Sequence, residues 1–112
     1  MPTLRDLVSA LRQRPGIDAA VVVGRDGLVI AGDASPHVDM DELAARVPPL
    51  IDAFEGLAPG TTSAVMAHTH GHLVYVALGG DDVLLLLAQD TAGVAQLVTD
   101  LRRHRGNIAA LV

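Results

Sequence analysis

Three histidines near the middle of the chain, His68, His70 and His72, are the side chains whose types and spacing best suit a metal ion. Histidines that alternate along a strand lie on one face of it, and zinc accepts imidazole nitrogen as a ligand. Asp81 or Asp82 from the next predicted turn could supply a further ligand. The same spacing also occurs in an exposed hairpin with His70 in its turn, and there the three rings do not converge. We favour the hairpin, and we predict no metal ion and no cofactor.

Two other groups of charged side chains have simpler structural explanations. Three acidic residues between positions 39 and 42 could form a carboxylate site, but they also match the start of a helix, whose positive end favours acidic side chains. Three arginines between positions 102 and 105 could contact phosphate, but without interleaved aromatic residues they are more typical of a helix C-terminus. The sequence also lacks a phosphate-binding glycine loop, a nucleophile-elbow motif and cysteine. We therefore predict a protein that is not an enzyme.

The composition indicates one domain over residues 1–112 with a core of aliphatic side chains. Half of the 112 residues are hydrophobic, so the chain can bury a core although Phe54 and Tyr75 are its only aromatic residues. The net charge of −5 argues against a nucleic-acid partner. The longest wholly apolar run, residues 83–88, is far too short to cross a membrane, and the N-terminus does not resemble a secretory signal. We expect no membrane insertion and a cytoplasmic location.

Apolar spacing and turn residues predict three helices and five strands. The strongest local signal is Asp26-Gly27 between two apolar runs, because a tight hairpin turn needs residues that accept positive φ. The predicted helices cover residues 4–11, 40–57 and 94–108, and the predicted strands cover residues 21–23, 28–31, 61–68, 73–78 and 83–88. The last helix is expected to begin at a cap formed by Asp90 or Thr91.

Pro48 and Pro49 interrupt the second predicted helix. A proline inside a helix removes one N–H group and clashes with a carbonyl one turn earlier, at a cost of about 3 kcal/mol. The apolar period nevertheless continues through both prolines. We therefore predict either one kinked helix or two short helices hinged at Val47, with the prolines in the first turn of the second.

The element order α-β-β-α-β-β-β-α specifies the expected architecture. Every link between consecutive strands is short, so the sheet should be antiparallel. The runs at residues 73–78 and 83–88 are apolar without alternation, which is typical of central strands that are covered on both faces. The run at residues 61–68 is more polar and should form an edge. These features predict an α/β protein of the α+β type, a three-layer α/β/α sandwich around a five-stranded antiparallel sheet.

Taken together, these segments resemble the roadblock / dynein light chain 7 family, including its bacterial MglB-like branch. The resemblance covers nearly the whole chain. It rests on the first helix, residues 16–23 (GIDAAVVV), residues 26–31 (DGLVIA), residues 43–45 (LAA) and the last two strands. It implies a roadblock, profilin-like fold with strand order 2-1-5-4-3. It also implies a homodimer or heterodimer that joins its third strands edge to edge and packs its second helices together.

The resemblance further implies which residues meet the second copy. The dimer-interface candidates lie on the third strand and the second helix: Thr62, Ala64, Val65, Met66, Ala67, Val47, Leu50 and Phe54. The edge position of the third strand follows independently from its more polar sequence. An edge strand without charge or proline invites pairing with another strand. Pro48-Pro49 departs from the family pattern, in which the second helix continues without interruption.

Three functions follow from these observations. The first is a non-enzymatic dimeric adaptor that binds and regulates a Ras-like small GTPase, since the resemblance implies that the face with the second helices docks such GTPases. The second is a structural scaffold whose binding does not depend on a GTPase. The third is a metal-binding protein that uses the three histidines. We favour the adaptor.

Overall fold

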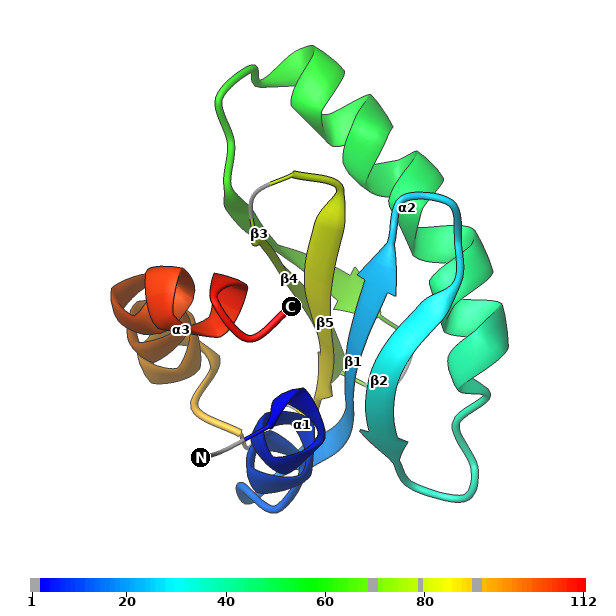
Figure 1. The fold of residues 1–112 in the computed structure, drawn as a ribbon, viewed down its shortest axis with the longest axis vertical. Coiled ribbons are helices and arrows are strands. Elements are labelled where there is room, and N and C mark those ends of the chain that lie inside the picture. Colours follow the sequence, from blue (N-terminus) through cyan, green and yellow to red (C-terminus); the bar gives the residue numbers. More distant parts are fainter. Residues whose placement is uncertain (1–2, 69–70, 79, 90–91) are drawn as a thin grey trace.

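Eight elements follow one another in the predicted order (Figure 1). The computed structural model describes residues 3–68, 71–78, 80–89 and 92–112. The elements are α1 (Leu4–Arg12), β1 (Ile17–Gly24), β2 (Val29–Ala34), α2 (Met40–Leu57), β3 (Ser63–His68), β4 (Gly71–Ala77), β5 (Asp82–Ala88) and α3 (Val94–Ala109).

The five strands form one antiparallel sheet in the order β2-β1-β5-β4-β3. This is the order that the resemblance implies. β5 lies at the centre with β4 and β1 beside it, as expected for strands without alternating polarity. The two edges are β2 and β3, so the prediction that the more polar strand forms an edge is confirmed.

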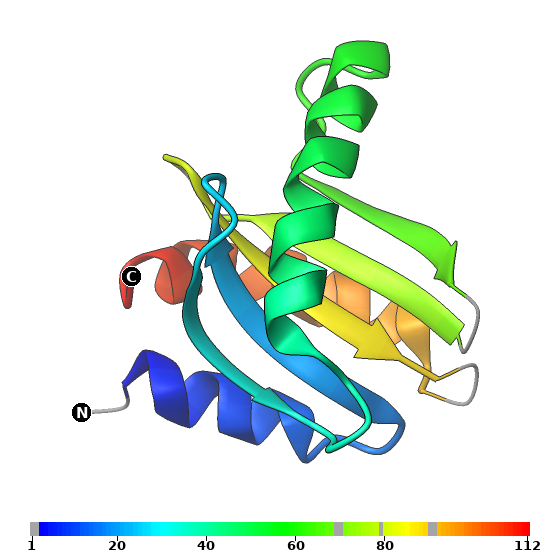
Figure 2. The ribbon, with the colours of Figure 1, turned by 90° about the vertical axis from the view of Figure 1, so that its right-hand side faces the viewer.

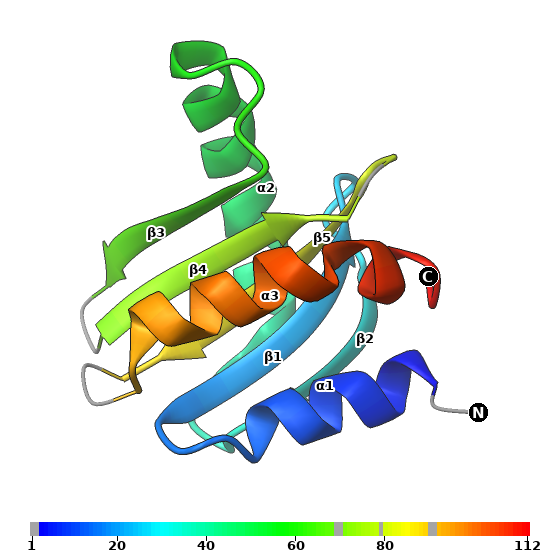
Figure 3. The same cartoon turned by 90° about the vertical axis from the view of Figure 1, so that its left-hand side faces the viewer.

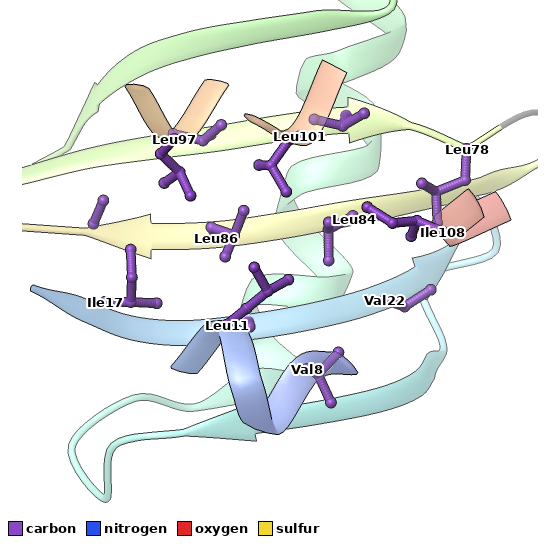
Figure 4. Close-up of a cluster of buried hydrophobic side chains, with 14 residues drawn as sticks. Val8, Leu11, Ile17, Val22, Leu78, Leu84, Leu86, Leu97, Leu101 and Ile108 are labelled. Carbon is purple, nitrogen blue, oxygen red and sulfur yellow. The ribbon is translucent and has the colours of Figure 1, made fainter. Parts of the chain in front are cut away.

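Helices cover both faces of the sheet, which confirms the three-layer architecture. α1 and α3 lie on one face (Figure 3), and α2 crosses the other (Figure 2). Each face has its own hydrophobic core. Beneath α1 and α3, Leu11, Leu84 and Leu97 belong to a cluster of buried aliphatic side chains (Figure 4). Beneath α2, the buried cluster includes Tyr75 and Ile51.

Local signals at the helix starts explain why two of the three helices begin where they do. Thr3 Oγ1 accepts a hydrogen bond from the N–H of Asp6 at 3.2 Å, and Asp6 Oδ2 accepts one from the N–H of Thr3 at 2.9 Å. This reciprocal capping satisfies two of the free N–H groups of α1. At α2, Asp39 Oδ1 accepts from the N–H of Glu42 at 3.1 Å. α3 instead begins after Gly93, which lies in the left-handed region at φ 63°. Residues 90 and 91, the expected cap, lie outside the described residues.

The β1–β2 hairpin has the turn that its sequence predicts. Gly27 adopts φ +85°, and Asp26 Oδ1 accepts a hydrogen bond from the N–H of Leu28 at 3.1 Å. Next to the turn, Val22 pairs with Ala31 and Val23 pairs with Val29. Ile30 is therefore an extra residue between these pairs, a β-bulge near the start of β2.

α2 continues as one helix through Pro48 and Pro49, so the alternative of two helices hinged at Val47 is wrong (Figure 1). The physical reason is the continuous apolar face that the helix presents to the sheet. Val47 is 2% exposed, Ile51 is 1% exposed, and Pro48 itself is buried. Burial of this face holds both sides of the proline pair against the same surface and offsets the lost hydrogen bonds.

Candidate interaction surface

The outer edge of β3 is open in this chain. Among the described strands, β3 pairs with β4 alone, so the backbone groups along its other side face away from the sheet. Its register with β4 is regular from Ser63 to His68, and the sequence between Ser63 and Ala67 contains no charged residue and no proline. A regular, uncharged edge can add a further strand.

The candidate residues on β3 divide between the two faces of the sheet. Ala64 and Met66 pack against the hydrophobic core beneath α2. Val65, which is 42% exposed, and Ala67 belong to the opposite set of alternating positions, with Ser63. Thr62 is exposed just before the strand, and its carbonyl accepts a hydrogen bond from the N–H of Ala77 at 2.8 Å. A strand pairing with β3 would therefore contact apolar side chains on both faces.

The second half of α2, residues 48–57, starts on the sheet, and its end projects past the ends of the strands (Figure 2). Leu50 is 52% exposed and Leu57 is 88% exposed on this segment. Ile51, by contrast, points into the core at 1% exposure. Of the predicted interface residues on α2, Leu50 is exposed, Phe54 is half-buried, and Val47 is buried within its own chain.

Phe54 connects the second half of α2 to the sheet. Its ring contacts the ring of Tyr75 on β4 edge to face, with 6.4 Å between centroids and an interplanar angle of 80°. This arrangement sets the positive edge of one ring against the negative face of the other. Tyr75 is fully buried, and this burial raises the pKa of its phenol, with a smaller contribution from the Glu55 carboxylate.

Arg25 in the β1–β2 turn forms a second connection to the same part of α2. Its Nη1 donates to Asp52 Oδ1 at 2.7 Å and to Glu55 Oε2 at 3.0 Å, and its Nη2 donates to Glu55 Oε1 at 2.8 Å. We call Arg25, Asp52 and Glu55 the Arg25 cluster. The hydrogen bond from Arg25 lowers the pKa of Glu55, and Glu55 in turn raises the pKa of Arg25.

A groove of about 370 Å³ opens between the first half of α2 and the sheet. Apolar and charged side chains both line it. The apolar ones include Leu43, Leu50, Leu73 and Leu87, and the charged or titratable ones include His37, Asp39, Glu42, Arg46 and His72. Glu42 and Arg46 also pair with each other at 3.0 Å, one helical turn apart. The groove lies next to the exposed part of α2, so the two form one continuous face with mixed chemistry.

The histidine hypothesis concerns residues that are only partly described. His72 lies on β4 beside the groove, His70 lies outside the described residues, and for His68 only the backbone is described, at the end of β3. Within the described part of the chain, no three histidine, aspartate or glutamate side chains come together as a metal site. Nor does any helix in that part have the length and hydrophobicity to cross a membrane.

Sequence reasoning did not identify the Arg25 cluster or the groove. Arg25 and Glu55 are 30 positions apart, and only the packing of the hairpin turn against α2 brings them together. A detectable signal was the spacing of Asp52 and Glu55, which places two acidic side chains on one side of a helix. Without a known partner, that spacing is indistinguishable from a solvated helix face.

Comparison with known proteins gives one family and several similar structures. Residues 3–89 match the Roadblock/LC7 domain. No curated protein matches the chain. Myxococcus xanthus MglB superposes with a TM-score of 0.83 at 13% identity, over 96% of this chain and 93% of that one. The gliding protein MglB from Thermus thermophilus gives 0.81 at 19% identity, over 96% and 87%. A Roadblock/LC7 domain from Streptomyces avermitilis gives 0.69 at 26% identity, over 92% and 98%.

Proposed function

The chain belongs to the Roadblock/LC7 domain family, and from this premise we propose that it is a dimeric adaptor that binds and regulates a Ras-like small GTPase. The observation that carries the proposal is the open, regular edge of β3 on the same molecule as an exposed apolar segment of α2. The similarity to the fold of MglB proteins supports it. In this role the protein contributes binding surfaces and no catalytic side chains of its own.

In the proposed dimer, the β3 strands of two copies pair along their open edges. Such pairing satisfies the outward N–H and C=O groups of both strands and extends the two sheets into one. Two-fold symmetry places the same residues on both sides of the junction. Thr62, Ala64, Val65, Met66 and Ala67 are the proposed contacts from this strand.

α2 provides the second part of the proposed dimer contact. Leu50 and Leu57 expose apolar surface on the segment that projects beyond the sheet, and Phe54 is half-buried there. Covering exposed leucines against a second helix is favourable by about 25 cal/mol per Å² of apolar surface. Val47 is buried within its own chain, so we propose that it supports this contact from beneath.

We propose that the GTPase docks on the face that carries α2 and the groove. The groove combines leucine side chains with charged groups such as Glu42 and Arg46. Docking surfaces of proteins that associate reversibly typically have such an apolar centre with charged surroundings. The family resemblance suggests both the class of partner and the face, and the exposure of Leu50 and Leu57 supports the choice of this face.

Two measurements test the proposal in order. Light scattering of the purified protein at micromolar concentration should give twice the mass of the 11.6 kDa chain. Binding of small GTPases from native extract should then differ between GDP and a GTP analogue, and the captured GTPase should change its hydrolysis rate when the protein is added. A monomer contradicts the dimer. Binding that ignores the nucleotide contradicts regulation and indicates a scaffold instead.

A further inference from the structure

The two prolines of α2 weaken the helix at the start of its second half. Pro48 and Pro49 lack the N–H groups that would otherwise bond to the carbonyls of Ala44 and Ala45. A helix without two consecutive hydrogen bonds bends more easily at that place. The orientation of the second half of α2 therefore depends on contacts other than the helix backbone.

Few apolar contacts fix that second half. Among its residues only Pro48 and Ile51 are buried, and Phe54 contacts Tyr75, whereas the side chains of Asp52 and Leu57 are exposed. Gly56 further lowers the helix propensity near the end of the segment. Segments with so little burial open more readily than the core of a domain.

The Arg25 cluster joins the β1–β2 turn to the second half of α2. The turn that carries Arg25 packs against the proline site, since a Cβ placed on Gly27 would lie 3.6 Å from the carbonyl oxygen of Ala44. From there the guanidinium spans both carboxylates, with a bidentate contact to Glu55 and one bond to Asp52. The side chains of Arg25 and Glu55 are each only 28% exposed, so water screens this pair less than an ordinary surface pair.

The turn itself is firmly attached to the sheet. The N–H of Arg25 donates to the carbonyl of Asp81 at 2.9 Å, which ties the β1–β2 turn to the β4–β5 turn. The N–H of Gly24 donates to the carbonyl of Leu28 at 3.0 Å and closes the hairpin. Because the backbone of Arg25 is held in place, its planar guanidinium binds the carboxylates in a defined orientation. A lysine ammonium, which has no planar donor geometry, would not define that orientation.

We propose that Arg25 is a positioning residue. It fixes the angle of the second half of α2, so that the exposed side of this segment is preorganised for contact with the second copy of the chain. This inference rests on the proposed function, because it assigns the orientation of the surface that the second copy and the GTPase would contact. A preorganised segment binds more tightly because it is already ordered, so binding does not have to supply the entropy cost of ordering it. Arg25 also offsets negative charge at Asp52 and Glu55, two carboxylates that lie on the same segment as the exposed Leu50 and Leu57.

Substitution of Arg25 tests the proposal, with Arg14→Gln as a matched control. Arg14 is also an arginine that joins two distant elements, because it pairs with Asp100 of α3 at 3.3 Å on the opposite face of the sheet. In Arg25→Gln, amide hydrogen exchange at residues 50–57 should be about tenfold faster, and the dimer dissociation constant about tenfold higher. Arg25→Lys should fall between Arg25→Gln and the wild type. Arg14→Gln should leave exchange at residues 50–57 and the dissociation constant unchanged.

A second variant separates the positioning effect of the ion pairs from the effect of leaving the charges of Asp52 and Glu55 unpaired. Asp52→Asn with Glu55→Gln removes the ion pairs but also removes the negative charges, so exchange at residues 50–57 should again be about tenfold faster. If exchange in either variant equals that of the wild type, Arg25 does not position the segment. A monomeric wild type would contradict the proposed dimer alone, because the exchange measurement reads the segment in either state.

Discussion

The two edges of the sheet differ in how well they are protected against pairing. β2 contains a β-bulge at Ile30 and an acidic residue, Asp33, and α1 packs against it. β3 has a regular register with its neighbour and no charge between Ser63 and Ala67. Bulges and charges are the devices by which natural sheets prevent edge-to-edge association. The chain therefore protects one edge and leaves the other available.

This difference makes β3 the edge at which a further strand can pair with less obstruction. The second half of α2 shows the same contrast within one element, because its buried side continues the core while its other side exposes leucine. The proposed interactions depend on these two surfaces, the open edge of β3 and the exposed side of the second half of α2.

Aspartate at equivalent exposed positions on the two edges should give the largest contrast. Val65 and Ile30 are 42% and 47% exposed, so the two substitutions have similar starting points. Val65→Asp should raise the dimer dissociation constant about a hundredfold, because like charges face each other across the paired edge. Ala67→Asp should act in the same direction. Ile30→Asp should change it by no more than about twofold, and sedimentation equilibrium measures all three.

Equal shifts for the Val65 and Ile30 variants would mean that charge acts through overall repulsion. The β3 edge would then not be the interface.

Removal of Arg102 should weaken the contact between α3 and β3. Arg102 Nε on α3 donates to Ser63 Oγ at 2.7 Å, and Ser63 is only 7% exposed. Arg102→Ala should lower the free energy of unfolding by about 1 kcal/mol, because the buried hydroxyl loses this partner. Arg103→Ala, at an exposed neighbouring position, serves as the control and should be close to neutral. Urea denaturation of both variants distinguishes a specific anchor from a general loss of positive charge on α3.

Acid should weaken the Arg25 cluster and leave β3 unaffected. The Arg25 hydrogen bond lowers the pKa of Glu55 from its usual 4.5, so this pair contributes stability above that value. The contribution is lost as the pH falls through the lowered pKa. The stability difference between wild type and Arg25→Gln should therefore shrink as the pH falls below 4.5. Protection against hydrogen exchange, corrected for the intrinsic exchange rate at each pH, should fall severalfold at residues 50–57 but not at residues 64–66, which carry no ionisable group.

A pH-independent difference between wild type and Arg25→Gln would show that the ion pair to Glu55 is not what holds the segment.

The smallest effect should come from Asp33→Val on β2. Removal of the charge leaves the bulge at Ile30, so the edge remains partly protected. We expect weak association beyond the dimer that becomes visible only at high protein concentration, as a small rise in the mass measured by sedimentation. Strong association would mean that Asp33 alone protects this edge.

The fold was predictable from sequence because its signals are local and periodic. Asp26-Gly27 specified the hairpin, Thr3 and Asp6 specified the start of α1, and unbroken apolar runs identified the central strands. The continuity of α2 was only half foreseen, because local reasoning counts the cost of two prolines but not the burial of Val47 and Ile51 that offsets it. The Arg25 cluster joins residues that are far apart in the chain, and single charged residues carry no periodicity.

The contact between Phe54 and Tyr75 has one practical consequence. The chain contains a single tyrosine, a single phenylalanine and no tryptophan. Because phenylalanine absorbs and emits only weakly, the intrinsic fluorescence of the chain is dominated by Tyr75, which lies where the second half of α2 meets the sheet. Any event that lifts or tilts α2 changes the surroundings of this one fluorophore. The protein thus carries its own optical reporter of that movement, and it can be read without a label.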